Sequence, residues 1–283
     1  MGTYQPAPQP EILPPGAEYN PPQPQARPQA RRRWPSWASS RATYLLVGIN
    51  CAVFLAMTLN GINPVNPSPE KLYLWGADHA GAVLIGGEWW RIVTAMFVHV
   101  GILHLATNMW CLWNLALLAE PLMGSFGVVA VYVLTGAAGN LLSTAVNWAW
   151  PMHDSSGNVL FPVGAGASGA VFGIAGALIV LLKSPRLPVP PLELKRLRRS
   201  VIYFAVINLV IGGGISFGSH YTGIHIDNMA HIGGCASGLL FAVPMVPRIG
   251  SDRDQFQERL RLAVGIIAAI LVLFGFYLSK LPG

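Results

Sequence analysis

The chain has 283 residues, of which only 11% are charged, against roughly 25% in an ordinary soluble domain. Hydrophobic residues make up 53% of the chain, so the charged side chains are too few to cover a soluble surface. This composition excludes an ordinary soluble protein and indicates a membrane protein.

Seven stretches of at least 18 residues contain no Asp, Glu, Lys or Arg, and each can hold one membrane-spanning helix of about 20 residues. They lack the alternation of apolar and polar residues that a membrane barrel needs, and they lack the charged outer faces of helices in a soluble core. We therefore predict an all-α polytopic membrane protein with seven transmembrane helices, one in each of 42–69, 92–119, 121–153, 155–182, 200–226, 228–247 and 262–279.

The segment before the first helix, residues 1–41, holds 10 of the 23 prolines together with many glutamines. It contains no apolar run of signal-peptide length. Such a composition has too little apolar surface to form a packed core, so we predict a disordered cytoplasmic tail.

The basic residues predict the orientation. With a cytoplasmic amino terminus, 15 of the 18 Lys and Arg residues fall in inside segments, and only Lys71, Arg91 and Lys280 fall outside. The positive-inside rule thus places the amino terminus in the cytoplasm and the carboxyl terminus outside. The same bias accounts for the net charge of +6, so no nucleic-acid partner is predicted.

The connection between the first two predicted helices is about 40 residues long, more than a simple turn needs. We expect it to have a structure or function of its own. It contains Trp75, Trp89 and Trp90, and tryptophan favours the headgroup zone, so we expect the connection to lie partly in the outer leaflet.

Polar groups inside a membrane span are costly, which makes them candidate functional groups. His104 and Asn108, in the second predicted helix, are four residues apart and share one face. His99 lies five residues before His104 and points elsewhere. We predict that His99 bonds loop backbone near the helix mouth and takes no direct part in catalysis.

Ser168 begins the fourth predicted helix, and its small neighbours in 166–169 cannot shield it. The free N–H groups at a helix start favour developing negative charge. His231 lies early in the sixth predicted helix. Because the second, fourth and sixth helices all run inward from the outside, we expect Ser168 and His231 at the same depth as His104 and Asn108.

Two Gly-x-x-x-Gly pairs accompany this serine and this histidine. Such pairs let helices approach until their backbones nearly touch, which would bring Ser168 within hydrogen-bond reach of His231. A lone transmembrane serine is more often a packing residue, whereas a serine beside a histidine is a candidate nucleophile. The pairs are Gly169 with Gly173 and Gly234 with Gly238.

These residues resemble the motifs of the rhomboid intramembrane serine proteases over about residues 43–247. The matching motifs are Trp90-Arg91, His99 with His104 and Asn108, Gly166-Ala167-Ser168-Gly169, and Ala230-His231 with Gly234 and Gly238. The resemblance implies a six-helix rhomboid-like catalytic core in 42–247. Residues 248–283 would then form a cytoplasmic linker and an appended seventh transmembrane helix.

By resemblance, Ser168 is the nucleophile and His231 the general base. The side chains of His104 and Asn108, with the Ser168 N–H, would form the oxyanion hole. Supporting residues are Gly166, Gly234 and Phe172, the last standing where the family often has a tyrosine stacked on the catalytic histidine. No cofactor and no metal are implied.

The implied activity is a serine endopeptidase that cleaves transmembrane protein substrates near the outer face of the bilayer, through an acyl-enzyme. Multi-pass insertion in a bacterial plasma (inner) membrane is the implied location, and no oligomeric state is predicted. The alternative is an inactive rhomboid-like protein that binds membrane clients. A metal site of His99, His104 and His231 is disfavoured because the chain lacks an H-E-x-x-H motif, and a transporter because it lacks clear internal repeats.

Asp227 is the one carboxylate near the candidate general base, four residues before His231 and on the same helical face. A Ser-His-Asp triad is therefore conceivable. However, four residues correspond to a rise of about 6 Å towards the outer surface, where the carboxylate can cap free N–H groups. We predict a helix cap and a catalytic dyad.

Overall fold

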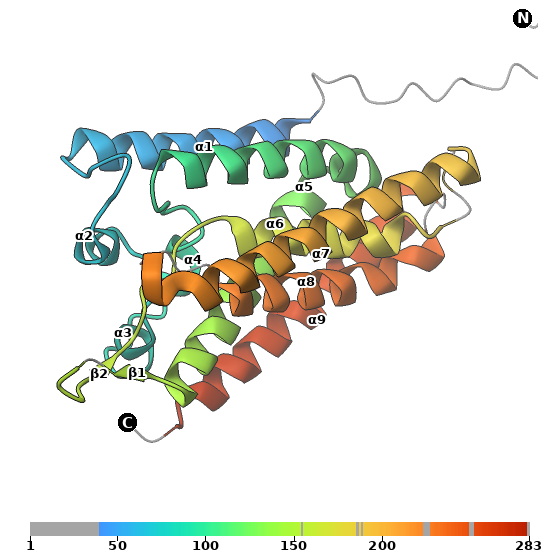
Figure 1. Cartoon of the computed structure of the whole chain (residues 1–283). Coiled ribbons are helices and arrows are strands. Elements are labelled where there is room, and N and C mark those ends of the chain that lie inside the picture. The colour runs from blue at the N-terminus through green and yellow to red at the C-terminus, as the bar shows by residue number, and fades with distance from the viewer. Residues whose placement is uncertain are drawn as a thin grey trace, which may run out of the picture. The chain divides into compact units, whose positions relative to one another are not determined.

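The computed structural model describes residues 40–153, 155–184, 187, 189–222, 227–248 and 252–281, with backbone alone for 212–222, 247, 248 and 253. All but the last two residues of the predicted tail lie outside the described residues. The helices are α1 (Arg41–Leu59), α2 (Pro69–Leu74), α3 (Ala80–Leu84), α4 (Arg91–Thr94), α5 (Ile102–Ala149), α6 (Ser168–Leu181), α7 (Pro191–Thr222), α8 (Asn228–Ala242) and α9 (Arg253–Leu278), with a 3₁₀ helix at Val243–Arg248 (Figure 1).

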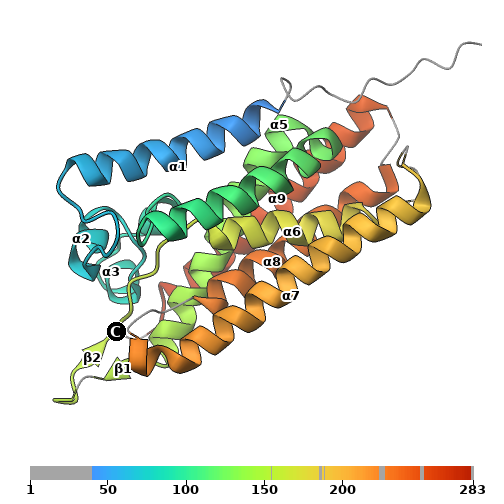
Figure 2. The same cartoon turned by 45° about the horizontal axis from the view of Figure 1, so that its top comes forward.

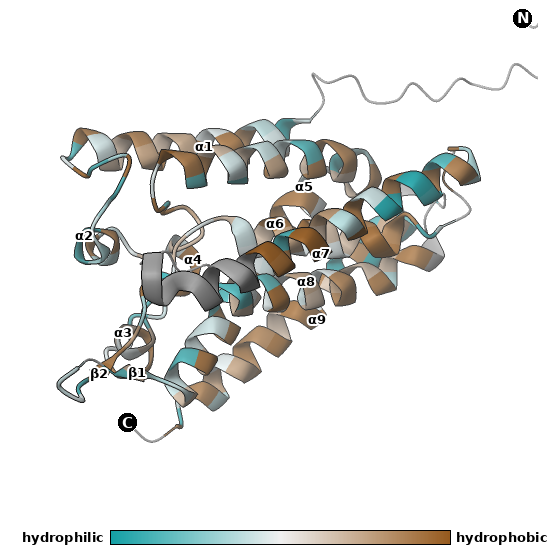
Figure 3. Cartoon of the chain, in the orientation of Figure 1, coloured by the Kyte–Doolittle hydropathy of each residue, from teal (hydrophilic) through white to brown (hydrophobic). Residues whose placement is uncertain are grey.

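The prediction of an all-α polytopic membrane protein is confirmed. Four described helices are long and apolar enough to cross a membrane, namely Arg41–Leu59, Ile102–Ala149, Asn228–Val246 and Asp254–Leu278. Figure 3 shows hydrophobic residues along much of these helices, while hydrophilic residues gather at the start of α7. The chain is therefore an integral membrane protein.

Helix α5 contains two of the predicted spans in one run of 48 residues. Its non-helical backbone at Gly124 (φ 74°, ψ 168°) divides it into a first arm and a second arm. Dividing α5 there gives seven long helical segments among the described residues, the number predicted from the charge-free stretches.

The break between the two arms falls at Gly124 and not at Glu120, where the charge-free stretches were separated. Glu120 stays helical and buried because its carboxylate accepts the N–H groups of Ala42 and Thr43 and the hydroxyl of Ser125. The carboxylate thus ties the start of α1 to the turn in α5. A charge inside a helical membrane protein is tolerated when its hydrogen bonds are satisfied in this way.

Helix α6 is shorter than the helix of about 20 residues expected in 155–182. It has 14 residues, and the chain before it forms a small hairpin of β1 (Met152–His153) and β2 (Val159–Leu160). The hairpin strands were not predicted. Helix α6 lies between other helices, in contact with α5, α7 and α8 (Figure 2), so its apolar residues are buried on nearly every side.

The long connection after α1 has its own structure, as expected, and contains α2, α3 and α4. Buried Arg91 holds this first loop together. Its guanidinium donates to Glu88 at 2.6 Å and to the carbonyl oxygens of Tyr73 and Ala77, and it stacks over the Tyr73 ring at 3.9 Å. The second arm of α5 returns to this loop, where Asn140 donates to the carbonyl oxygen of α4 residue 92.

Candidate active site

The candidate site is built on direct backbone contact between α6 and α8, which we call the α6–α8 seam. A β-carbon added at Gly234 would overlap the carbonyl oxygen of Gly169, and one added at Gly238 would overlap that of Gly173. No residue larger than glycine fits at Gly234 or Gly238 without moving one helix. The predicted close approach of these helices is confirmed.

The seam aligns the first turns of the two helices. The ring of Phe172 stacks on the imidazole of His231, with centroids 4.3 Å apart and planes inclined by 12°. Ser168 is the first residue of α6, one turn before Phe172 and on the same face, and it is partly exposed. His231 is buried, and its Nδ1 has no hydrogen-bond partner among the described residues. The hydrogen bond between Ser168 and His231 stays a prediction.

His104 approaches the chain just before Ser168. At Gly166, where φ is +135°, a β-carbon would lie 2.6 Å from Cε1 of His104, so the edge of the imidazole rests on this backbone. The N–H of Val100 donates to Nδ1 of His104 at 3.4 Å. That bond leaves Nε2 as the protonated nitrogen, free to donate toward a developing oxyanion.

Asn108 lies one turn further along the first arm of α5 and on the same face as His104. Its side chain is buried and its Nδ2 donates to the carbonyl oxygen of His104 at 2.9 Å. Both residues thus belong to the wall of α5 that faces α6. The amide has a second N–H that this bond does not use.

His99 is fully buried and bonds backbone, as predicted. Its Nδ1 pairs with the carbonyl oxygen of Phe97 at 3.2 Å, and its Nε2 accepts the N–H of Ala167 at 3.4 Å. The second of these bonds reaches the residue immediately before Ser168 and therefore fixes the start of α6. Within the described ranges, no three His, Cys, Asp or Glu side chains are grouped as metal ligands would be.

A family model for the Rhomboid domain matches residues 86–248, more than half of the chain. The chain belongs to the rhomboid family. The match includes every candidate site residue described above and ends before α9.

Three relatives are named as proteases. The chain is 31% identical to the rhomboid protease GluP of Bacillus subtilis over 80% of its length, but it spans only 38% of GluP. It is 29% identical to the rhomboid protease AarA of Providencia stuartii, covering 83% of this chain and 82% of AarA. It is 26% identical to Rhomboid-like protease 2 of Toxoplasma gondii, covering 80% and 75% of the two chains.

Asp227 caps helix α8 of this rhomboid, as predicted. Its Oδ1 accepts the N–H of Ala230 at 2.9 Å, and its Oδ2 accepts the hydroxyl of Ser143 from the second arm of α5. These bonds orient the carboxylate toward the helix start and α5. The carboxylate therefore serves the seam by fixing the amino-terminal end of α8.

Asp78 was missed in the sequence and lies beside this cap. The carboxylate is buried, accepts the hydroxyl of Thr144, and faces Asp227 across Gly164, whose backbone pairs with that of Asp78. Burial, with a smaller contribution from the charge of Asp227, raises the pKa of Asp78 to about 7. The sequence does hold one indication of this buried carboxylate, because Asp78 is a single acidic residue in an otherwise apolar part of the first loop.

Proposed function

We propose that this protein is an intramembrane serine endopeptidase that cleaves transmembrane segments of other membrane proteins. The observation that carries the proposal is the stacking of Phe172 on His231 at 4.3 Å, one helical turn from Ser168. Catalysis by a serine needs a base within reach of its hydroxyl. The glycine seam supports this requirement, because it holds the first turns of α6 and α8 in contact.

In the proposed reaction, His231 takes the proton of the Ser168 hydroxyl while the oxygen attacks a peptide carbonyl. The tetrahedral oxyanion accepts hydrogen bonds from the Ser168 N–H and the side chains of His104 and Asn108. His231 then donates the proton to the leaving amine, which leaves an acyl-enzyme on Ser168. His231 next deprotonates a water molecule, which attacks this ester; the C–O bond to Ser168 then breaks, His231 returns the proton to the serine oxygen, and the new carboxyl terminus is released.

A dyad suffices if packing orients the imidazole. Phe172 covers one face of the His231 ring, and α8 holds its backbone through the glycine contacts. Asp227 accepts bonds from Ala230 and Ser143 instead. We therefore assign it the role of a helix cap rather than a third catalytic residue.

The proposed site lies within the bilayer near its outer face. The 14 residues of α6 rise about 21 Å, less than the hydrocarbon thickness of about 30 Å. With a cytoplasmic amino terminus, Ser168 at the start of α6 would then lie below the outer surface. We propose a bacterial plasma membrane, a catalytic core in 42–247, and a linker and seventh helix in 248–283.

Turnover of a reporter with one transmembrane segment tests the proposal, with purified variants reconstituted in liposomes. Ser168→Ala and His231→Ala should each abolish cleavage, since nucleophile and base act as a unit. Asn108→Ala should cost about 10²-fold, as for the loss of one oxyanion donor. Circular dichroism and gel filtration would establish that each variant is folded.

Two results would contradict this proposal. More than half of the wild-type turnover in Ser168→Ala or His231→Ala would remove that residue from the reaction. A wild-type protein that binds the reporter without cleaving it would indicate a client-binding protein instead.

A further inference from the structure

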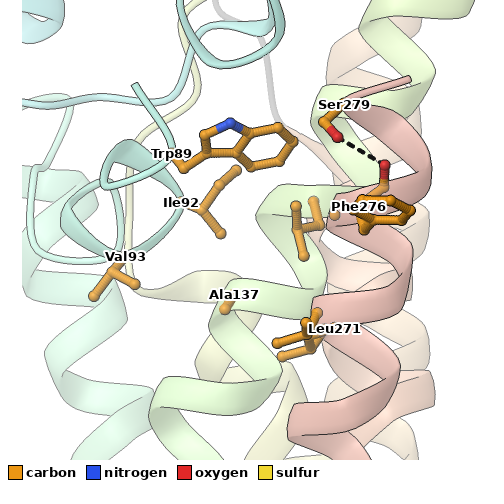
Figure 4. A pocket seen from close by; sticks show the side chains of 10 residues that line it. Trp89, Ile92, Val93, Ala137, Leu271, Phe276 and Ser279 are labelled. Carbon is orange, nitrogen blue, oxygen red and sulfur yellow. Dashed lines mark hydrogen bonds between the residues drawn. The ribbon is translucent and has the colours of Figure 1, made fainter. Parts of the chain in front are cut away.

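An apolar groove, which we call the α9 groove, lies between the first loop, the second arm of α5 and α9 (Figure 4). Trp89 and Ile92 line it from the first loop, Ala137 from α5, and Leu271 and Phe276 from α9. None of these residues belongs to the proposed active site. The α9 side also lies beyond the part of the chain that the family model matches.

Helix α9 carries a glycine, Gly275, where the groove faces the first loop. A β-carbon at Gly275 would lie 3.6 Å from Cζ3 of Trp89, an ordinary contact distance. A longer side chain at this position would therefore extend into the groove without disturbing the backbone. Three residues further on, Leu278 is 2% exposed and packs with Val83 and Ile92, which fixes α9 to the first loop.

The dimensions of the groove suit a lipid chain. Its lining positions on α9 extend from Leu271 to Ser279, a rise of about 12 Å, which is close to one leaflet of about 15 Å. A partner transmembrane helix would need about 20 residues and a contact surface spanning both leaflets. The groove offers apolar walls over one leaflet only.

A cation marks the rim of the groove. The ammonium of Lys280 lies 5.2 Å from the ring centre of Phe276, a wall residue, and forms no ion pair with any carboxylate in the described ranges. The carboxylate of Glu88, the residue before the wall residue Trp89 in the chain, is bound to Arg91 at 2.6 Å, so its charge is compensated. The rim thus carries an unneutralised positive charge at the end of an apolar channel.

We propose that the α9 groove binds one acyl chain of an anionic glycerophospholipid, with the phosphate of that lipid against Lys280. The acyl chain fills the space beside Gly275 and covers Phe276, which is 63% exposed. The ammonium supplies the charge complement to the phosphate at the level where the hydrocarbon ends. The bound lipid would join the seventh helix to the first loop.

Native mass spectrometry of the full chain in detergent, titrated with phosphatidylglycerol, measures this binding. We expect one lipid to bind more tightly than the rest. Gly275→Leu should lower the affinity for that first lipid by about tenfold, because the loss of two buried methylene groups of the acyl chain is enough for this effect. Lys280→Gln should weaken it by about fivefold, the contribution of one basic residue near a phosphate.

The matched control is Gly265→Leu. It makes the same change on the same helix at a position with no neighbouring atom within 4 Å, so its lipid affinity should equal that of wild type. Equal affinities for Gly275→Leu and Gly265→Leu would overturn the proposal. Wild-type lipid affinity in Lys280→Gln would also overturn it. If the wild-type chain forms a dimer that Gly275→Leu abolishes, the occupant of the groove is a second copy of the chain and the proposal is wrong. The readout does not involve turnover, so its failure would leave the proposed protease activity untouched.

Discussion

Two helix contacts of this rhomboid use glycine in opposite ways. In the α6–α8 seam, a β-carbon at Gly234 or Gly238 would overlap a carbonyl oxygen of the facing helix. In the α9 groove, a β-carbon at Gly275 would meet Trp89 at 3.6 Å. The first contact is closed at the level of the backbone, and the second leaves room for a β-carbon.

Both contacts have the same lipid surroundings, so the difference follows from the residues that each contact holds. Lipid chains are as apolar as leucine, so helices in a membrane gain little from apolar burial alone and associate through close packing. The seam obtains that packing from glycine and holds two polar residues in register, as a reaction requires. The contact of α9 has no such residues to align and can leave part of its surface to lipid.

The seam can be broken with one methyl group. Gly238→Ala would force α6 and α8 apart, at a cost of about 1–3 kcal/mol in unfolding free energy. A displacement of about 1 Å between the first turns would lower turnover by about 10²-fold. Reporter cleavage and thermal unfolding in detergent measure both effects.

Gly265→Ala is the control for this change, because its new methyl group would contact no other helix or loop within 4 Å. Wild-type turnover in Gly238→Ala would mean that close contact in the seam is not needed for activity.

A second change tests packing inside the seam. Phe172→Leu removes the ring stacked on His231, an aromatic contact that contributes about 0.5–1.5 kcal/mol beyond its burial. We expect turnover to fall by about tenfold and the thermal midpoint to fall as well, because leucine leaves a cavity where the buried ring stood. Phe172→Tyr, which keeps the ring, should retain turnover. Equal loss in both variants would contradict an orienting role for the ring.

The cap at the amino-terminal end of α8 should tolerate loss of the Asp227 charge. Asp227→Asn keeps an oxygen that can accept the N–H of Ala230, and asparagine caps helices about as well as aspartate. Turnover should therefore remain within about threefold of wild type, whereas a triad member would lose about 10⁴-fold. A loss approaching that of His231→Ala would make Asp227 catalytic.

The smallest effect is expected at Asp78, outside the seam. Its pKa is about 7 in the folded protein and 3.8 when exposed, so the folded state binds the proton more tightly. The contribution of Asp78 to the free energy of unfolding therefore rises by about 1 kcal/mol as the pH falls from 8 to 6. This corresponds to a rise of about 3 °C in the thermal midpoint.

Asp78→Asn should remove this pH dependence of the thermal midpoint, while its amide oxygen can still accept the hydroxyl of Thr144. The groups facing Asp78 are Asp227 and Arg91, and both remain in the variant. Identical pH profiles of the thermal midpoint for wild type and Asp78→Asn would contradict this prediction.

Much of the fold could be predicted because charges are excluded from membrane spans. The start of α6 at Ser168 is the one predicted from the sequence. The break in α5 was misplaced at Glu120, because a charge-free count treats every carboxylate as an interruption. Here the carboxylate is satisfied by N–H groups of α1, a contact between residues nearly 80 positions apart.

The candidate site was found through short motifs, but its supports were found only in three dimensions. The spacing of His104 and Asn108 along one helix is visible in a sequence. The bond from Ala167 to His99 and the pairing of Asp78 with Thr144 join distant segments, so no local pattern encodes them. The length of α6 was overestimated because apolar loop residues precede it without any charge.

The central claim is that Ser168 is a nucleophile activated by His231. Mass spectrometry of the full chain after reaction with a fluorophosphonate, followed by proteolysis, locates the modified residue. We predict one adduct, on Ser168, that disappears in the folded His231→Ala variant. An adduct on another residue, no adduct in wild type, or equal labelling of wild type and His231→Ala would contradict the claim.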